Sequence, residues 1–169
     1  NGLREGPFEI FRVSGTRRET GSYENDKLSG PNSFYDADGI LVDTGCYKSG
    51  LLDGPRTAYA RSQGSETVIS SIRNYEAGVL QATREYHASG RLTKSVEFRE
   101  DGSGVERLYA DDESLQRETE VRANYSRTTY LREGYDRAYG PNGILWETFY
   151  RSGQRAGTHR RYSANGVLC

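Results

Sequence analysis

The chain has 169 residues and a formal net charge of -1, a length that suits one domain or one short repeat array and a charge that gives no bias toward nucleic acid or an anionic membrane. Its hydrophobic content of 34% and mean hydropathy of -0.85 are low for a globule built of two packed layers. Because disordered segments are poor in aromatic residues, the 13 Tyr and 5 Phe, together with 20 Gly, instead indicate ordered strands separated by glycine turns.

An aromatic residue followed four or five positions later by a turn glycine recurs along the chain. The copies run from Phe11 to Gly15, Tyr35 to Gly39, Tyr59 to Gly64, Tyr86 to Gly90, Tyr139 to Gly143 and Tyr162 to Gly166, and Tyr109 leads a seventh copy without the glycine. These leading aromatics are 24, 24, 27, 23, 30 and 23 residues apart. Such regular spacing indicates a repeat of about 24 residues.

A second aromatic marks the other half of each unit, at Tyr23, Tyr47, Tyr75, Phe98, Tyr125 and Tyr150. Each half ends in a turn signal such as Asp-Gly, Ser-Gly or Asn-Gly, so one unit is one β-hairpin. The runs between turns lack the apolar periodicity of a helix. We therefore predict an all-β fold, an extended, curved single-layer antiparallel meander of about seven hairpins and twelve to fourteen strands. Residues 1–169 would form a single repeat array, with units that start near residues 6, 30, 54, 82, 105, 134 and 157.

The recurring aromatics are expected to hold neighbouring repeats together. Because successive side chains of a strand alternate between faces, the leading aromatics should share one face and stack as a ladder across the repeats. Stacked rings add roughly 0.5–1.5 kcal/mol per pair beyond their burial. Most tyrosines are therefore assigned to the scaffold and not to a binding site.

Two irregular stretches interrupt the repeat. Extra residues enter near Ser65 to Ile72, and a longer expansion lies between Tyr109 and Tyr139. Within the second stretch, residues 111–131 diverge most and could form either a bulged loop or a short helix, since the segment beginning at Asp111 has tolerable helix formers.

The most regular copies resemble a known family. Gly30-Pro-Asn-Ser-Phe-Tyr-Asp-Ala-Asp-Gly-Ile-Leu and Gly45-Cys-Tyr-Lys-Ser-Gly-Leu-Leu-Asp-Gly54 are similar to the variant MORN repeats of bacterial antitoxins of the YwqK type. The resemblance extends over nearly the whole chain, with departures at residues 109–113 and around Tyr125. It implies an immunity protein (antitoxin) that binds a cognate secreted toxic effector, such as a lipid-cleaving type VI secretion effector, and blocks its active site.

Residues able to carry out catalysis are scarce. The two histidines, His87 and His159, are too few for a catalytic triad or a zinc site. The run from Asp36 to Gly39 has the start of a calcium loop without its distal ligands, so a turn explains it better. We expect no enzyme, cofactor, metal site or catalytic residue, and no disulfide between Cys46 and Cys169, which lie far apart along the array.

Charge is unevenly distributed along the chain. Residues 97–120 hold nine acidic residues against three Arg, whereas residues 132–162 hold six Arg against three acidic residues. Solvated strand faces would explain this pattern, and so would electrostatic steering of a protein partner. Because Arg and Trp are enriched at interface hot spots, the candidate partner-binding residues are Arg132, Arg137, Trp146, Arg151, Arg155, Arg160 and Arg161, followed by Asp111, Asp112 and Glu113.

The expected location is the bacterial periplasm. The sequence contains no Met and begins at Asn1, which favours export with an N-terminal signal that is absent here. The expected partner is the cognate toxin, with no nucleic acid and with membrane contact only through a removed signal or lipid anchor. An alternative function is a MORN-type membrane-associated or structural scaffold, which the basic final third would favour and the near-neutral total charge disfavours.

Overall fold

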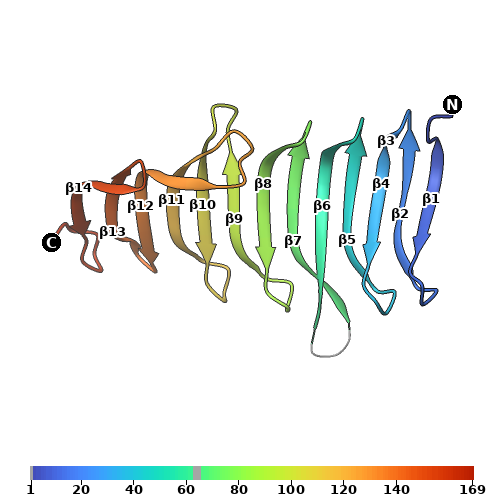
Figure 1. The fold of residues 1–169 in the computed structure, drawn as a ribbon. Helices are drawn as coiled ribbons and strands as arrows, with labels where there is room; N and C mark the ends of the chain where they lie inside the picture. The colour runs from blue at the N-terminus through green and yellow to red at the C-terminus, as the bar shows by residue number, and fades with distance from the viewer. Residues whose placement is uncertain (1, 63–65) are drawn as a thin grey trace. The chain divides into compact units, whose positions relative to one another are not determined.

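A computed structural model of the chain describes residues 2–62 and 66–169. These residues form fourteen β-strands and no helix (Figure 1). In particular, the described part of the chain has no helix with the length and apolar character needed to span a membrane. The all-β prediction is therefore confirmed.

The chain divides into two compact units, of which unit 1 comprises Asn1–Leu80 and Tyr86–Gly90. The sheet of unit 1 has the order β1-β2-β4-β5-β6-β7, and β3 pairs with β2. All of its strand pairs are antiparallel, as a hairpin meander requires. The strands are β1 (Gly6–Phe11), β2 (Arg17–Glu24), β3 (Lys27–Leu28), β4 (Gly30–Tyr35), β5 (Leu41–Lys48), β6 (Leu51–Arg61) and β7 (Thr67–Glu76).

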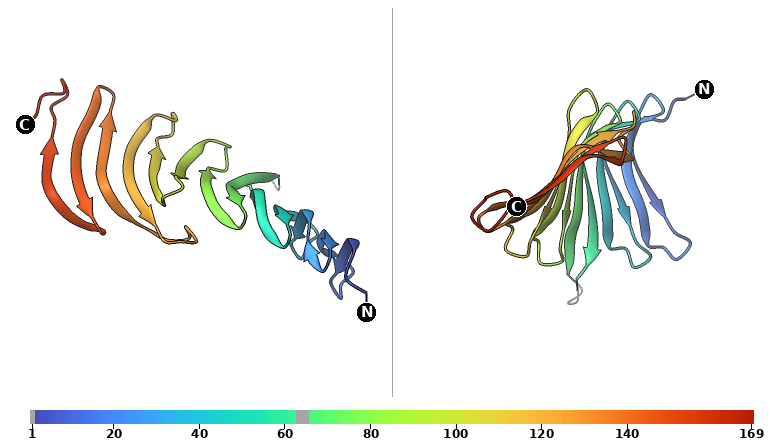
Figure 2. Two further views of the ribbon diagram at one scale, coloured as in Figure 1. Left: turned by 90° about the horizontal axis from the view of Figure 1, so that it is seen from above. Right: turned by 90° about the vertical axis from the view of Figure 1, so that its left-hand side faces the viewer.

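Unit 2 comprises Gln81–Glu85 and Arg91–Cys169, and β8 (Val79–Tyr86) contributes residues to both units. The remaining strands of unit 2 follow one another in sequence order and pair antiparallel. Within each unit the strands lie in one layer and curve along their length, as the meander prediction requires (Figure 2). The strands are β9 (Leu92–Phe98), β10 (Ser103–Tyr109), β11 (Leu115–Ala123), β12 (Tyr130–Gly140), β13 (Gly143–Arg151) and β14 (Gln154–Arg161).

Each leading aromatic lies within two residues of the end of a strand. The strand register shifts by a bulge immediately before five of them, namely Phe11, Tyr35, Tyr59, Tyr109 and Tyr139. The bulge sets the aromatic opposite an aliphatic residue of the next strand in the pairs Tyr35–Leu41, Tyr59–Ile69, Tyr109–Leu115 and Tyr139–Ile144. An aromatic beside an aliphatic residue is a stabilising cross-strand pair, so the repeated Tyr closes its own hairpin.

The prediction that these aromatics stack across repeats is wrong. Among the described residues, no ring contact joins two members of either predicted ladder, and the ring pairs are Phe8–Tyr23, Phe98–Tyr130, Tyr135–Phe149 and Trp146–His159. The reason is geometric. Equivalent residues of neighbouring repeats are two strands apart, about 9.6 Å, whereas paired rings need centroids within about 7 Å of each other.

The second aromatic of the repeat lies opposite a glycine. The pairs are Tyr23–Gly6, Tyr47–Gly30, Tyr75–Gly54, Phe98–Gly104 and Tyr150–Gly134. At Gly104 an added Cβ would lie 2.8 Å from the Phe98 ring, so the ring covers backbone that no larger residue could share with it. Tyr125 does not belong to this set, because it is 95% exposed in the loop after β11, and Tyr130 makes the ring contact with Phe98 instead.

The divergent segment is a turn, a strand and a loop, so the helix alternative is wrong. Ala110 accepts a hydrogen bond from the Glu113 amide, as Arg12 does from Gly15 in the first hairpin. Glu113 has φ 64°, the left-handed conformation that glycine adopts at this place in other repeats. The turn therefore persists without its glycine. The corresponding glycine of the third copy, Gly64, lies outside the described residues, as does Ser65.

The buried side chains of this single layer are mostly polar. The buried hydrophobic residues are Leu80, Val96 and Val121, whereas Asn32, Ser71, Ser95, Thr119, Arg127, Asp136, Glu147 and Thr148 are buried polar or charged residues. Such groups must be hydrogen-bonded or ion-paired to be tolerated. The stability of the sheet therefore depends strongly on polar pairing between neighbouring strands.

Candidate functional site

Acidic and basic side chains alternate along one face of unit 2. The strand register places Arg107, Glu118, Arg137, Glu147 and Arg160 opposite one another on successive strands from β10 to β14. Arg84 on β8 and Glu97 on β9 extend the row through further ion pairs. We call these seven residues the ion-pair ladder.

The ion-pair ladder is continuous. From Arg84 to Arg160 its consecutive N···O distances are 3.4, 3.5, 3.0, 3.9, 3.3 and 3.2 Å. At its far end the Tyr162 hydroxyl donates to Glu147 at 2.8 Å. That hydrogen bond, with those from Arg160 and Arg137, holds the pKa of the Glu147 carboxyl below its ordinary value. Two of the candidate partner-binding residues, Arg137 and Arg160, are thus engaged within the scaffold.

The opposite face of the same strands carries aromatic and basic residues. Arg117, Trp146 and Arg161 share one cross-strand row, through Ala138 on β12. Tyr150 and Arg155 are paired further along β13 and β14. We use the name aromatic–basic face for the set Arg117, Arg132, Trp146, Tyr150, Arg155, His159 and Arg161.

A buried carboxylate organises part of the aromatic–basic face. Asp136 is fully buried and accepts hydrogen bonds from Arg117 at 2.7 and 2.5 Å and from Thr119 at 3.0 Å. The Arg132 guanidinium lies 3.3 Å from the same carboxylate. Burial alone would raise the pKa of Asp136, but these partners, Arg117 first, hold it below its ordinary value. The carboxylate therefore stays charged and fixes both arginines.

The aromatic rings on this face are held by the same arginines. Arg117 lies over the Trp146 ring at 5.3 Å, and Arg132 lies over the Tyr150 ring at 5.0 Å and donates to its hydroxyl at 3.1 Å. The ring of His159 lies 5.7 Å from that of Trp146. Cation–π contacts of this kind orient an aromatic side chain without covering all of it. Trp146 is half-buried and therefore still presents part of its surface.

Three of the candidate arginines have no acidic partner. In the described ranges, Arg151 and Arg155 make no side-chain hydrogen bond or ion pair, and Arg161 donates only to His159, at 3.3 Å. All three are exposed. Strand alternation places Arg155 and Arg161 on the aromatic–basic face and Arg151 on the other face. The structure therefore brings Arg132, Trp146, Arg155 and Arg161 together and separates them from Arg137, Arg151 and Arg160.

The acidic candidates belong to the turn between β10 and β11. Asp112 accepts hydrogen bonds from the Ser114 hydroxyl at 2.6 Å and from its amide at 3.0 Å, which lower the pKa of the Asp112 carboxyl. Asp111 lies 3.2 Å from Arg91, although its own side chain is 95% exposed. Glu113 supplies the left-handed turn residue. These contacts account for Asp112 and Glu113 as turn formers and leave Asp111 at the surface.

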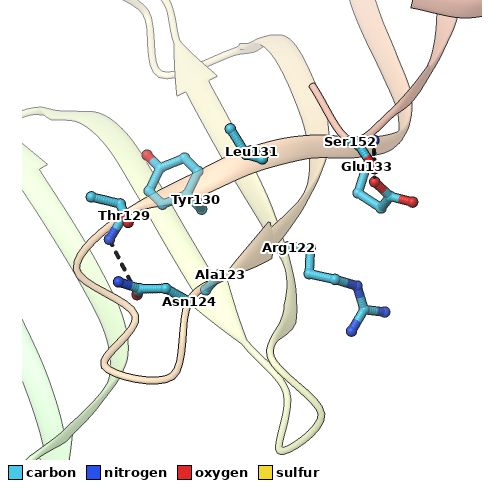
Figure 3. Close-up of a pocket in the computed structure, with 8 residues that line it drawn as sticks. All are labelled: Arg122, Ala123, Asn124, Thr129, Tyr130, Leu131, Glu133 and Ser152. Atoms are coloured by element: carbon cyan, nitrogen blue, oxygen red, sulfur yellow. Dashed lines mark hydrogen bonds between the residues drawn. The ribbon is translucent and has the colours of Figure 1, made fainter. Parts of the chain in front are cut away.

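The loop after β11, residues 124–129, is a feature that the sequence-based site prediction missed. Beside it lies a pocket of about 430 Å³ with mostly apolar walls, lined by Arg122, Ala123, Asn124, Thr129, Tyr130, Leu131, Glu133 and Ser152 (Figure 3). Leu131, the second residue of β12, is 59% exposed there. The available sequence signal was the loss of the repeat pattern around Tyr125.

Groups suited to metal binding or nucleophilic chemistry are sparse. Among residues 2–62 and 66–169, no three His, Cys, Asp or Glu side chains are placed to hold a metal ion. The two cysteines, Cys46 and Cys169, are free thiols, and His87 contacts Ser89 within its own turn at 3.0 Å. The arrangement on the aromatic–basic face is suited to recognising a partner through rings and cations.

Comparisons with known proteins give little guidance. No protein-family model and no curated protein sequence matches the chain. Among solved structures, it is similar to accessory secretory protein 1, 2 and 3 of Streptococcus pneumoniae, with 13% identity and a TM-score of 0.37 over 64% of this chain and 20% of that chain. It is also similar to a mutant of S. aureus TarM in complex with fondaparinux, α-GlcNAc-glycerol and UDP, with 7% identity and a TM-score of 0.37 over 75% of this chain and 21% of that chain. The chain thus spans about a fifth of the length of these solved chains, and the likenesses are too distant to indicate a function.

Proposed function

We propose that this chain is an immunity protein that binds a secreted toxic effector, such as a lipid-cleaving type VI effector, in the periplasm and blocks its active site. The contact surface in this proposal is the aromatic–basic face. The observation that carries it is the half-buried Trp146, with Arg161 opposite it and Arg155 opposite Tyr150 on the same face. Both arginines are exposed and have no acidic partner in the described structure. The resemblance of the repeats to variant MORN repeats supports the immunity role.

The physical argument rests on preorganisation and charge. Trp and Arg are the residues most enriched at binding hot spots, and side chains already fixed before binding lose less entropy when a partner docks. Asp136 and the cation–π contacts fix Arg117 and Arg132. Arg155 and Arg161 keep their charge available for acidic groups of the effector, which favours association and excludes partners of like charge.

Binding to the effector encoded beside this gene provides the test. We expect the intact chain to bind and inhibit that effector, and the double variant Arg155→Glu/Arg161→Glu to bind at least about tenfold more weakly. Arg151→Glu is the matched control, because Arg151 is also exposed and unpartnered in the described structure but lies on the opposite face. Absence of binding by the intact chain, or an equal loss in the control, would contradict the proposal.

Anionic vesicles separate this proposal from a membrane-associated scaffold. A scaffold that contacts lipid head groups should sediment with phosphatidylserine vesicles at low salt, since each exposed basic residue near an anionic surface contributes about 1 kcal/mol. We expect the chain to remain in the supernatant. Sedimentation that is lost in the double variant would assign the aromatic–basic face to lipid instead.

A further inference from the structure

We infer that residues 124–129 form a preorganised docking loop, whose exposed Tyr125 inserts into an apolar recess of the protein partner. This inference rests on the proposed function, because the partner is the same effector, but it assigns a second contact outside the aromatic–basic face. The loop follows β11 and interrupts the hairpin repeat. Insertions of this kind on a rigid scaffold are a common position for binding residues.

Tyr125 is presented to solvent and makes no contact that the fold requires. Its side chain is 95% exposed. Across the described ranges it makes no hydrogen bond, ion pair or ring contact. The other second aromatics of the repeat lie opposite a glycine of a neighbouring strand, whereas Tyr125 lies in a loop. An unsupported tyrosine ring contributes nothing to folding but can bury a large area when a partner covers it.

Asn124 holds the loop closed from within. Its Oδ1 accepts hydrogen bonds from the Thr128 amide at 3.0 Å and the Ser126 hydroxyl at 3.4 Å. It also accepts one from the Thr129 amide at 3.4 Å, and Figure 3 shows Asn124 and Thr129 side by side. Its backbone amide donates to the Thr129 carbonyl at 3.0 Å, which closes the base of the loop. Side-chain bonds of this type fix a turn in one conformation. The backbone that carries Tyr125 is thus ordered before any partner arrives.

Arg127 fastens the loop to the sheet from the other side. It is only 7% exposed, and its guanidinium donates to Gln81 at 2.6 Å and to the carbonyls of Arg99 and Glu100 at 2.8 and 3.3 Å. It also lies over the Phe98 ring at 5.7 Å. Burying a guanidinium is costly unless its donors are satisfied. The buried, hydrogen-bonded guanidinium of Arg127 therefore anchors the loop, and it lies only two residues from Tyr125, whose side chain is exposed.

The pocket beside the loop adds an apolar surface next to Tyr125's loop. Its walls are mostly apolar and include Tyr130 and the exposed Leu131, and Asn124 and Thr129 of the loop form part of its lining. A partner surface that covers the loop would also reach this pocket, because Asn124 and Thr129 belong to both. The chemistry fits an apolar protein surface better than a charged ligand, because the apolar part of the lining exceeds the polar part.

The experiment measures effector binding and thermal stability for the intact chain, Tyr125→Ala, Tyr125→Phe and the control Val13→Ala, which removes another fully exposed side chain. We expect Tyr125→Ala to weaken binding about tenfold or more with an unchanged Tm, and the other two variants to bind nearly as the intact chain. Equal binding by Tyr125→Ala would overturn the docking loop alone. Lack of binding by the intact chain would overturn both this inference and the proposed function.

A second variant tests the preorganisation. Arg127→Ala removes the anchor and keeps Tyr125, so amide hydrogen exchange at Thr128 and Thr129 should accelerate and binding should weaken by about fivefold or more. Faster exchange with unchanged affinity would show that the ordered loop has no part in recognition. Unchanged exchange would show that Arg127 does not hold the loop.

Discussion

The guanidinium of Arg117 and the carboxylate of Asp136 form a two-point contact between β11 and β12, with Nε and Nη2 donating to separate oxygens at 2.7 and 2.5 Å. Asp136 is fully buried, and Arg117 is the bridge from it to the Trp146 ring. One ion pair thus serves the interior of the sheet and orients the aromatic–basic face. This double role couples the stability of the scaffold to the contact surface, and mutations can measure that coupling.

Arg117→Met should destabilise unit 2 by about 3 kcal/mol, because it leaves a buried carboxylate with only Arg132 and Thr119 as partners. Urea unfolding followed by circular dichroism measures the loss. Arg155→Met is the control, and it should change the unfolding free energy by less than about 0.5 kcal/mol, since its exposed side chain has no described partner. Equal effects of the two variants would show that the Asp136 contact is not structurally important.

Stability should fall as the solution is acidified. The folded-state pKa of Asp136 and that of Glu147 are both lowered by their partners. A carboxyl whose pKa is depressed on folding stabilises fully above its unfolded pKa of about 4, and this contribution is lost as the pH falls through the folded pKa. We therefore expect Tm to be nearly constant from pH 7 to 5 and to drop below about pH 4. Asp136→Asn should flatten that acid limb, and an unchanged limb would assign the acid sensitivity to other carboxyls.

Salt should weaken the ion-pair ladder. Glu118→Gln interrupts it between Arg107 and Arg137, which lie 3.0 and 3.9 Å from the carboxylate. Partly exposed pairs contribute about 0.2–1 kcal/mol each, so a cost of about 1 kcal/mol is expected at low salt. In 1 M NaCl the Debye length falls to about 3 Å, and the cost should shrink. The exposed Glu76→Gln should show neither effect, and a salt-independent cost at Glu118 would indicate lost packing instead.

The positions of strands and turns could be predicted from the sequence, because they depend on local chemistry. The spacing of the leading aromatics predicted the hairpins, and the bulge before Tyr35, Tyr59 and Tyr139 shows why an aromatic recurs at the strand end. The stacked ladder was wrong because hydrogen-bonded strands have a fixed separation. The local pattern was therefore informative about each hairpin and misleading about contacts between hairpins.

The candidate site was only partly predictable, because strand register decides which charges meet. Arg137 lies between Glu118 and Glu147 on the two neighbouring strands, so the acidic and basic segments of the sequence neutralise each other across the sheet. The register shift between Thr119 and Val121 sets Arg132 opposite Val121, two residues away from the partner that regular pairing would give it. Alternation along β14 separates Arg160 from Arg161, but only the register shows that Arg160 meets Glu147 whereas Arg161 lies opposite Trp146.

The turn without its glycine offers a test of the repeat itself. Glu113 adopts φ 64°, and Gly90 adopts φ 84° at the equivalent place after Tyr86. A left-handed conformation costs a residue with a Cβ about 1–2 kcal/mol, so Glu113→Gly should stabilise the chain by about 0.5–1 kcal/mol after the larger entropy of unfolded glycine is included. Gly90→Ala should destabilise it by a similar amount, although an added Cβ there would meet open space. Urea unfolding of both variants should therefore give shifts of opposite sign, because both report on one backbone conformation. Shifts of the same sign would mean that the two turns are not equivalent and that the repeat does not continue through residues 109–114.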